Sequence, residues 1–345
     1  MQLVVKNLIL LTIFFFLIHS ADAQQKIAAS DLKSLYKKED SLKVLAKSFL
    51  TDEATEDRMR KDSIFIKTLI RSLQIKYSFE FPFDSVQGVS HIYAPDSSFR
   101  IFTWQLNYQN EYAFSRQRGA IQFRTTDGSL KLVPLKDYSE FADNPIDSSR
   151  DKNTWIGAVY YNIIQTKFNG KNYYTLFGFD GNSYRTNKKW IDVLSFDLQG
   201  QPVFGGQSFF VFDKDPLKRK PQRRFAIEYK KEASTTMNFD EDKNMILVYH
   251  LISETNEPES PWTYVPDGDY EGFAWTNGKW VYVDKVFNEK IDMKGVDPSL
   301  GNPPVEDPLL DKDGNHNEQK LDEQNKKNTK KKDEKPVPKK PIKKG

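Results

Sequence analysis

The chain has 345 residues, a formal net charge of +3 and no cysteine. The lack of cysteine excludes disulfides, thiolate metal sites and cysteine nucleophiles in this chain, so a hydrophobic core has to hold the fold. From Lys326 onward there are ten Lys residues against Asp333 and Glu334. Because the basic excess lies in that tail, and a nucleic-acid-binding domain carries it on the fold, we do not expect a nucleic-acid partner.

The first residues have the pattern of a secretory signal peptide. Lys6 precedes an apolar run over residues 8–18, and the small-residue site Ala21-Asp22-Ala23 follows. This order of charge, apolar run and cleavage site is typical of export signals. The run is too short for a spanning helix, which needs about 20 residues. We therefore expect a signal peptide over residues 1–23, cleavage near Ala23, and a mature protein without a transmembrane segment in the periplasm or outside the cell.

Residues 24–76 form a predicted helical segment with two helices. Apolar residues recur there at three- and four-residue steps, which indicates amphipathic helices. The two stripes consist of Leu32, Leu35, Tyr36, Leu42, Leu45 and Phe49, and then of Met59, Ile66, Leu69, Ile70 and Leu73. We expect a helical pair packed on the main domain. A short coiled coil or partner-binding arm is the alternative, and it is disfavoured because the pattern does not last three or four heptads.

Residues 77–290 form a predicted antiparallel β domain. All six Trp lie there, and aromatic residues favour strands. Turn signals recur at Asp127-Gly128, Asn169-Gly170, Gln199-Gly200 and Asn277-Gly278. Further strand candidates are 99–106, 190–198, 207–212, 223–230 and 245–252. About ten strands with short turns favour a sandwich or barrel-like fold. An irregular propeller is the alternative, and it is disfavoured because the sequence shows no fixed-period repeat.

Two of the expected hairpins can be given a register. A two-residue loop at Asp127-Gly128 places Phe123 opposite Leu132. One face of the strand pair is then exposed to solvent, and the buried face carries Ile121, Phe123, Leu130 and Leu132. A loop at Asn169-Gly170 pairs Ile163 with Leu176 and puts apolar side chains on both faces, as in a strand that is covered on both sides.

A third hairpin, at Asn277-Gly278, is the leading candidate for a ligand-binding site. Its register pairs Trp275 with Trp280 and Phe273 with Tyr282 on one face. If these four rings are exposed, they form a platform on which sugar rings or peptide side chains can stack. If they are buried, they form a cross-strand ladder in the core, which is the usual place for such rings and the interpretation that we favour.

Alternating acids just before this hairpin are the alternative site. Asp267, Asp269 and Glu271 share one face if the chain is extended there. A glycosidase needs two carboxyl groups about 5–10 Å apart. Acids that alternate with glycines are more typical of a solvated turn, and no second acidic cluster faces this one in the sequence.

Other chemistry is sparse, and we assign no catalytic residue, metal site or cofactor. His91 and His250 are the histidines of the folded zone, and we expect both to be buried structural residues because a zinc site needs three or four ligands. The G-x-S-x-G motif of hydrolases is absent. A basic loop over residues 214–224 is expected to be solvated, or alternatively to contact an anionic surface. Residues 291–345 have the composition of a disordered, Lys-rich tail.

Three short motifs carry a family resemblance. The segments Ser98-Phe99-Arg100-Ile101-Phe102-Thr103-Trp104, residues 245–251 and residues 264–280 occur in this order. Together they resemble a group of exported proteins from Bacteroidetes-type bacteria, over roughly residues 90–290. The resemblance implies export and one continuous domain, and it implies no activity.

The sequence therefore favours an exported, envelope-associated or extracellular binding module, and a non-enzyme over an enzyme. A glycan or an envelope surface is the partner that we expect. One alternative is a carboxylate-dependent hydrolase acting on an envelope polymer or glycan. The other is a scaffold or assembly protein that uses the N-terminal helices as its interface.

Overall fold

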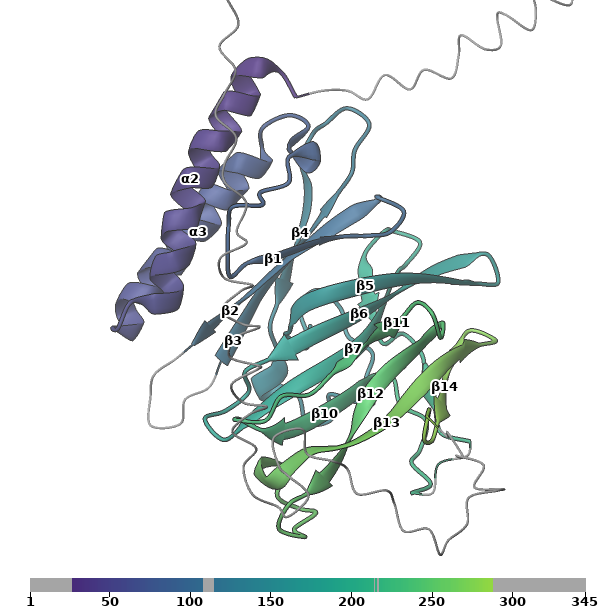
Figure 1. Ribbon diagram of the computed structural model, residues 1–345. Helices are drawn as coiled ribbons and strands as arrows, with labels where there is room; N and C mark the ends of the chain where they lie inside the picture. The colour runs from purple at the N-terminus through teal and green to yellow at the C-terminus, as the bar shows by residue number, and fades with distance from the viewer. Residues whose placement is uncertain (1–26, 108–114, 214, 216, 288–345) are drawn as a thin grey trace, which may run out of the picture. The chain divides into compact units, whose positions relative to one another are not determined.

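The fold is mainly β, with a helical pair at its N-terminal end (Figure 1). The structure is a computed structural model, and it describes residues 27–107, 115–213, 215 and 217–287. The expected signal peptide and Lys-rich tail lie outside these described residues. Within them, no helix combines the length and apolar character needed to cross a membrane.

The strands form three sheets. Sheet 1 has the order β1 (Ser90–Tyr93), β2 (Phe99–Asn107), β3 (Ser115–Phe123) and β4 (Lys131–Lys136). Sheet 2 has the order β10 (Phe225–Lys230), β7 (Thr186–Phe196), β6 (Lys171–Asp180) and β5 (Val159–Phe168), with β8 (Pro202–Phe204) paired to β7. Sheet 3 has the order β11 (Met237–Asp240), β12 (Met245–Ser253), β13 (Tyr264–Thr276), β14 (Lys279–Val283) and β9 (Phe210–Val211). All pairs are antiparallel except that of β14 with β9.

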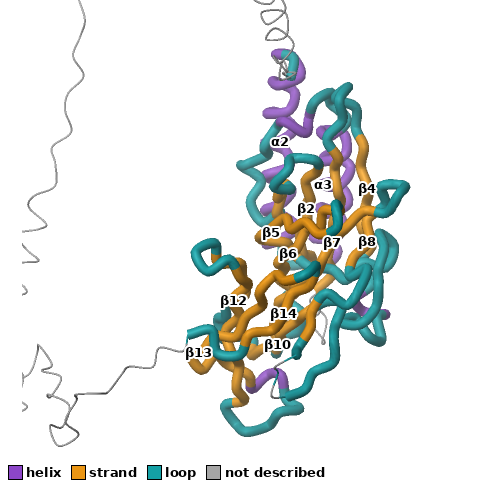
Figure 2. The backbone as a smooth tube through the Cα atoms, turned by 90° about the vertical axis from the view of Figure 1, so that its right-hand side faces the viewer, coloured by secondary structure: helices purple, strands orange, loops and turns teal. Residues whose placement is uncertain are grey.

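The two helices, α2 (Ala29–Thr51) and α3 (Thr55–Leu73), cover sheet 1 (Figures 1 and 2). Their buried apolar residues pack with Phe102 and Trp104 of β2 in one cluster. The helical pair is therefore confirmed as a layer on the domain. Tyr36 and Met59, which the stripes include, are 57% and 42% exposed, whereas Phe65, which they omit, is fully buried.

Sheet 2 lies between the other two sheets and is buried on both faces. In β6, Tyr174 and Leu176 pack in a cluster with residues of sheet 1, whereas Phe177 packs in a second cluster with residues of sheet 3. This alternation follows from the two-residue period of a strand. The layers therefore run from helices to sheet 1, sheet 2 and sheet 3, which is a sandwich. None of the three described sheets closes into a barrel.

The register of two hairpins is as predicted. Ile163 pairs with Leu176, and Trp275 pairs with Trp280. The turn residues Asn277 and Gly278 both have positive φ, 49° and 78°, which is the requirement of the tight turn that joins twisted strands without splaying them. Asn169 and Gly170 have the same property, with φ of 48° and 75°.

The predicted register of the hairpin at Asp127-Gly128 is wrong by one residue. Phe123 pairs with Lys131, and Gln122 pairs with Leu132. Ile121 therefore faces sheet 2, whereas Leu132 packs towards the helices, so apolar side chains near the turn lie on both faces of the pair. The connection spans residues 124–130, and the Gly128 carbonyl accepts a hydrogen bond from the backbone N–H of Tyr77. Because apolar residues lie on both faces near the turn, the apolar pattern does not select one register.

Trp280 links sheets 2 and 3. Its ring is fully buried, and its Nε1 donates to Thr175 Oγ1 at 3.0 Å. We expect Trp280→Ala to lower the free energy of unfolding by about 3–5 kcal/mol, because it leaves a cavity and an unpaired hydroxyl. The matched control is Trp262→Ala in the 3₁₀ helix η4 (Pro261–Thr263), where the residue is 37% exposed and a change below about 1 kcal/mol is expected. Urea denaturation measures both, and equal losses would contradict this assignment of Trp280 to the core.

Asp180, at the end of β6, makes stability depend on pH. Its carboxylate accepts from Gln117 Nε2 at 2.9 Å, and burial raises its pKa to about 6. The folded state therefore holds this proton more tightly than the unfolded chain does, so stability falls as pH rises from about 4 to about 6. We expect Asp180→Asn to be more stable than the wild type at pH 7, by up to about 3 kcal/mol, and to lose most of that advantage near pH 4.

Denaturant titrations at the two pH values test this expectation. Asp242→Asn, on the exposed turn between β11 and β12, is the control and should change stability little at either pH. A stabilisation of Asp180→Asn that is the same at both pH values would show that the effect is not the proton on this carboxyl group.

Candidate functional site

The aromatic hairpin lies mostly in the core. Phe273 and Trp280 are 0% exposed and Tyr282 is 6% exposed, all within the cluster between sheets 2 and 3, and Trp275 is half-buried against the same cluster. The inner face of β13 and β14 is turned towards sheet 2, so the four rings do not form an open platform. This corrects the ligand-binding interpretation of the hairpin and agrees with its buried alternative. Only Tyr282 also reaches a pocket.

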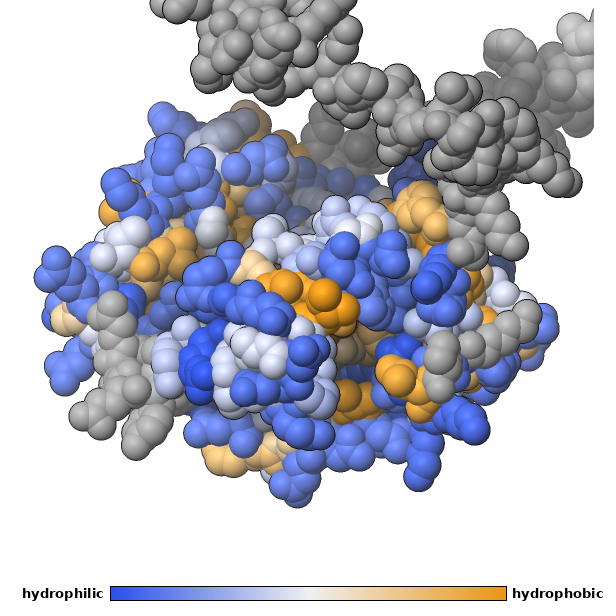
Figure 3. All heavy atoms as spheres, turned by 60° about the horizontal axis from the view of Figure 1, so that its bottom comes forward, coloured by the Kyte–Doolittle hydropathy of each residue, from blue (hydrophilic) through white to orange (hydrophobic). Residues whose placement is uncertain are grey.

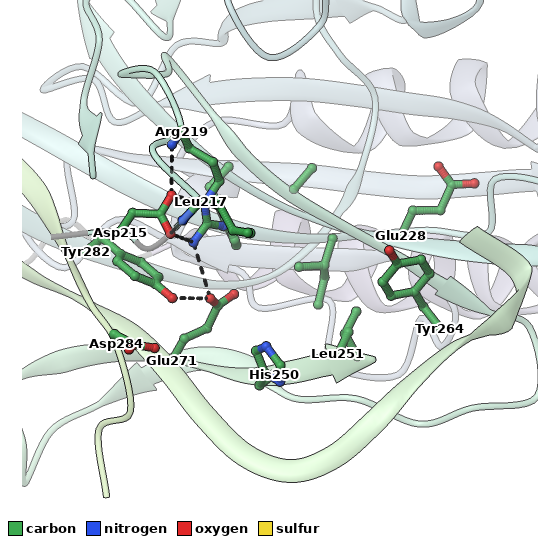
Figure 4. A pocket seen from close by; sticks show the side chains of 13 residues that line it. Asp215, Leu217, Arg219, Glu228, His250, Leu251, Tyr264, Glu271, Tyr282 and Asp284 are labelled. Atoms are coloured by element: carbon green, nitrogen blue, oxygen red, sulfur yellow. Dashed lines mark hydrogen bonds and ion pairs between the residues drawn. The ribbon is translucent and has the colours of Figure 1, made fainter. Parts of the chain in front are cut away.

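That pocket has a volume of about 400 Å³ and lies between β10 of sheet 2 and β12, β13 and β14 of sheet 3 (Figure 4). Its apolar wall is formed by Phe225, Ile227 and Leu251, among others. The acidic and basic side chains that line it are Asp215, Arg219, Glu228, His250, Glu271 and Asp284. The face shown in Figure 3 is hollowed near its middle, with hydrophobic atoms set among hydrophilic ones.

An irregularity in the pairing of β12 and β13 accompanies the pocket. The register shifts between Tyr249 and Leu251, which marks a β-bulge, and Gly268 on the opposite strand has a φ of +99°. A bulge bends its strand and increases the local twist. The pocket lies beside this irregular part of sheet 3, at its interface with β10.

Arg219 organises one end of the pocket. Its Nε donates to Asp215 Oδ2 at 2.8 Å, and its Nη2 lies 3.5 Å from Glu271 Oε2. The same Glu271 oxygen accepts from the Tyr282 hydroxyl at 2.8 Å. The guanidinium carbon lies 4.5 Å from the ring centroid of Phe212 and 4.6 Å from that of Tyr282. Arg219 is thus held by two carboxylates (Figure 4) and by two rings.

The network also shifts the pKa of its members. Burial opposes ionisation of Asp215, but hydrogen bonds from the Arg219 side chain and from the backbone N–H groups of Arg219 and Leu217 outweigh it and lower its pKa. Burial, the nearby Glu271 charge and the hydrogen bond to Glu271 raise the pKa of Tyr282, so its hydroxyl stays a donor. Asp215 is therefore ionised and Tyr282 is neutral at neutral pH.

The three alternating acids do not share one face, contrary to expectation. Glu271 is buried on the pocket wall, whereas Asp267 and Asp269 are exposed at the irregular part of β13. The backbone N–H of Asp269 donates to Asp267 Oδ1 at 3.0 Å, which folds this stretch back on itself. The local bend around Gly268 breaks the alternation that an extended strand would have.

His250 is not a buried structural residue as predicted, because 46% of its side chain is exposed at the pocket rim. Its Nδ1 lies 2.8 Å from Asp267 Oδ2. Burial tends to raise the pKa of Asp267, but the hydrogen bonds from His250 and from the Asp269 backbone outweigh this effect and lower that pKa.

His91 is half-buried, with Nδ1 3.2 Å from the Val89 carbonyl oxygen. No group of three or more His, Asp or Glu side chains in the described part of the chain could hold a metal ion.

The sequence does not single out Asp215 and Arg219 as site residues, because they lie inside the basic loop that is expected to be solvated. The arginines of this loop are used inside the protein instead. Arg224 is fully buried and pairs with Asp192 at 2.7 Å, and Arg223 donates to the Gly205 carbonyl at 3.0 Å. The four-residue spacing of Asp215 and Arg219 was the available signal, but it does not indicate that Glu271, 52 residues beyond Arg219, completes the network.

We expect Asp215→Asn to destabilise the protein by about 1–3 kcal/mol at pH 7, because Arg219 loses its closest charged partner. The lowered pKa of Asp215 means that its contribution is present above about pH 4 and is lost as pH falls below that value. Chemical denaturation at pH 7 and at pH 3 measures the difference. Asp213→Asn, two residues away and exposed, is the control that should leave stability nearly unchanged. A full loss that persists at pH 3 would contradict the ion-pair explanation.

No protein-family model, curated protein or solved structure matches this chain. A function has to be argued from a site in any case, because one fold can host many activities. The pocket between sheets 2 and 3 is the site from which the argument proceeds.

Proposed function

We propose that this protein is an exported binding module whose ligand site is the pocket between β10 and β12–β14. A concave site with an apolar wall and a few convergent polar groups is the usual form of a small-molecule site, and a volume of about 400 Å³ falls within the range of such sites. The single observation that carries the proposal is this pocket, with Glu271 and Arg219 held rigidly at one end. The leader pattern over residues 1–23 supports export.

The chemistry of the lining favours binding over carboxylate catalysis. A glycosidase needs one carboxyl group with a raised pKa to act as the acid. Asp215 and Glu271 are instead both bonded to Arg219, and the pKa of Asp215 is lowered. No Ser, Thr or Cys is among the described residues that line the pocket. The site therefore offers fixed charges and a shaped cavity rather than an acid and a nucleophile.

Filling the pocket tests the proposal. We expect Leu251→Trp to abolish the thermal shift that ligands from a panel of glycans, peptidoglycan fragments, amines and carboxylates cause in the wild type, because the indole occupies the centre of the site (Figure 4). Trp275→Ala, which alters the hairpin outside the pocket lining, should retain the shift. Circular dichroism checks that both variants fold. Ligands that still stabilise Leu251→Trp but not Trp275→Ala would move the site to the hairpin.

Hydrolysis is the second candidate, and it rests on the pair of His250 and Asp267. With Nδ1 donating to Asp267, neutral His250 presents Nε2 as an acceptor that can activate a water molecule. A panel of carboxylic esters, phosphate esters and glycosides, assayed with the wild type and with His250→Ala, tests this candidate. Turnover that His250→Ala loses would favour hydrolysis, and no turnover of any member by the wild type would remove it.

A further inference from the structure

The hydrogen-bonding side chains of the pocket are unequally used. Several donors are engaged within the protein, since Arg219 Nε and Nη2 are directed at Asp215 and Glu271, and the Tyr282 hydroxyl donates to Glu271. The Tyr264 hydroxyl, at the other end, donates to the Pro258 carbonyl at 3.0 Å. In contrast, neither Glu271 Oε1 nor the Asp284 carboxylate accepts a hydrogen bond within the described residues. The pocket thus offers free carboxylate acceptors at Glu271 and Asp284.

The side chains that line the pocket also carry more negative than positive charge. The lining contains four carboxylates, but only one permanent positive charge, that of Arg219, and the imidazole of His250. The carboxylates belong to Asp215, Glu228, Glu271 and Asp284. Arg219 compensates Asp215, and Lys188 Nζ lies 3.2 Å from Glu228 Oε2. His250 is paired with Asp267. Negative charge therefore remains at Glu271 and Asp284, and partial enclosure strengthens its attraction for a cation over that of an exposed pair.

The remaining surface suits an apolar stem. Leu251 lies between the cluster of Arg219, Glu271 and Asp284 at one end of the pocket and Glu228 with Tyr264 at the other (Figure 4). Glu271 is itself 8% exposed, so its position is set by packing rather than by solvent. A ligand can therefore place a charged head at Glu271 and Asp284 and extend its stem along Leu251 and Ile227.

We propose that the pocket binds an organic cation, a primary ammonium or guanidinium group on an apolar stem, through Glu271 and Asp284. This inference rests on the proposed function, because it names the ligand class of the same pocket. The cation can be a free amine or the side chain of Lys or Arg in a peptide, since both present the same head group and stem. Either one supplies N–H donors for the free oxygens of Glu271 and Asp284.

Calorimetric titration of the full chain with pentylamine, 1-pentanol and pentanoate tests the ligand class, because the three share a stem and differ in charge. We expect pentylamine to bind at least about tenfold more tightly than pentanol, with pentanoate the weakest, and added salt to weaken only the amine. Glu271→Gln and Asp284→Asn should each weaken pentylamine several-fold and leave pentanol unchanged. Asp284 is exposed, so its variant tests the charge without disturbing the core. Asp242→Asn is the control.

N-acetyl-lysine methylamide distinguishes the two sources. Tighter binding than pentylamine indicates a peptide side chain, and weaker binding indicates a free amine; in both cases the variants must act as stated. Pentanol or pentanoate binding as tightly as pentylamine, with loss in Leu251→Trp, would overturn the cation while leaving the pocket as the ligand site. If neither Leu251→Trp nor the charge variants change the binding of any probe, both the ligand class and the proposed function are wrong.

Discussion

Burial of sheet 2 on both faces is the constraint on which the rest of this structure depends. Each of its central strands sends alternate side chains into two different cores, as Leu176 does towards sheet 1 and Phe177 towards sheet 3. A polar side chain on such a strand needs a partner inside the protein, and Thr175 has one in the Trp280 indole. Sheets 1 and 3 are therefore required covers, and the helices in turn cover the outer face of sheet 1.

The pocket is located where this covering is incomplete. Beyond Glu271, towards Thr276, the inner face of β13 packs on sheet 2, and the rings of Phe273 and Trp275 belong to the shared core. On the other side of the pocket, β10 is the edge strand of sheet 2 and η4 packs against it. Glu271 lies at the boundary between core and pocket. A carboxylate can be buried there because Tyr282 and Arg219 bind it, and it still has an oxygen that faces the cavity.

Local signals predicted the parts of the fold that short-range geometry controls. The Asn-Gly turns set the register of their hairpins because a two-residue turn leaves no freedom, so Trp275 is opposite Trp280. At Asp127-Gly128 the connection is longer, and apolar residues on both faces allowed the wrong register. That register placed Ile121 and Leu132 on one face, whereas they lie on opposite faces. The candidate site was predicted least well, because Arg219 and Glu271 meet only through the packing of a loop on sheet 3.

By itself, the sequence determined the fold class, the helical pair and the tight hairpins, because periodicity and turn chemistry act within a few residues of the chain. Tertiary structure decided which segment of the chain packs on each face of the sheets and helices. It exposed His250 and enclosed Glu271 with Arg219, although neither outcome is visible in the residues that surround them in the sequence. The physical reason is that burial and the pairing of charges depend on segments that are distant in the chain and come together only when the sheets stack.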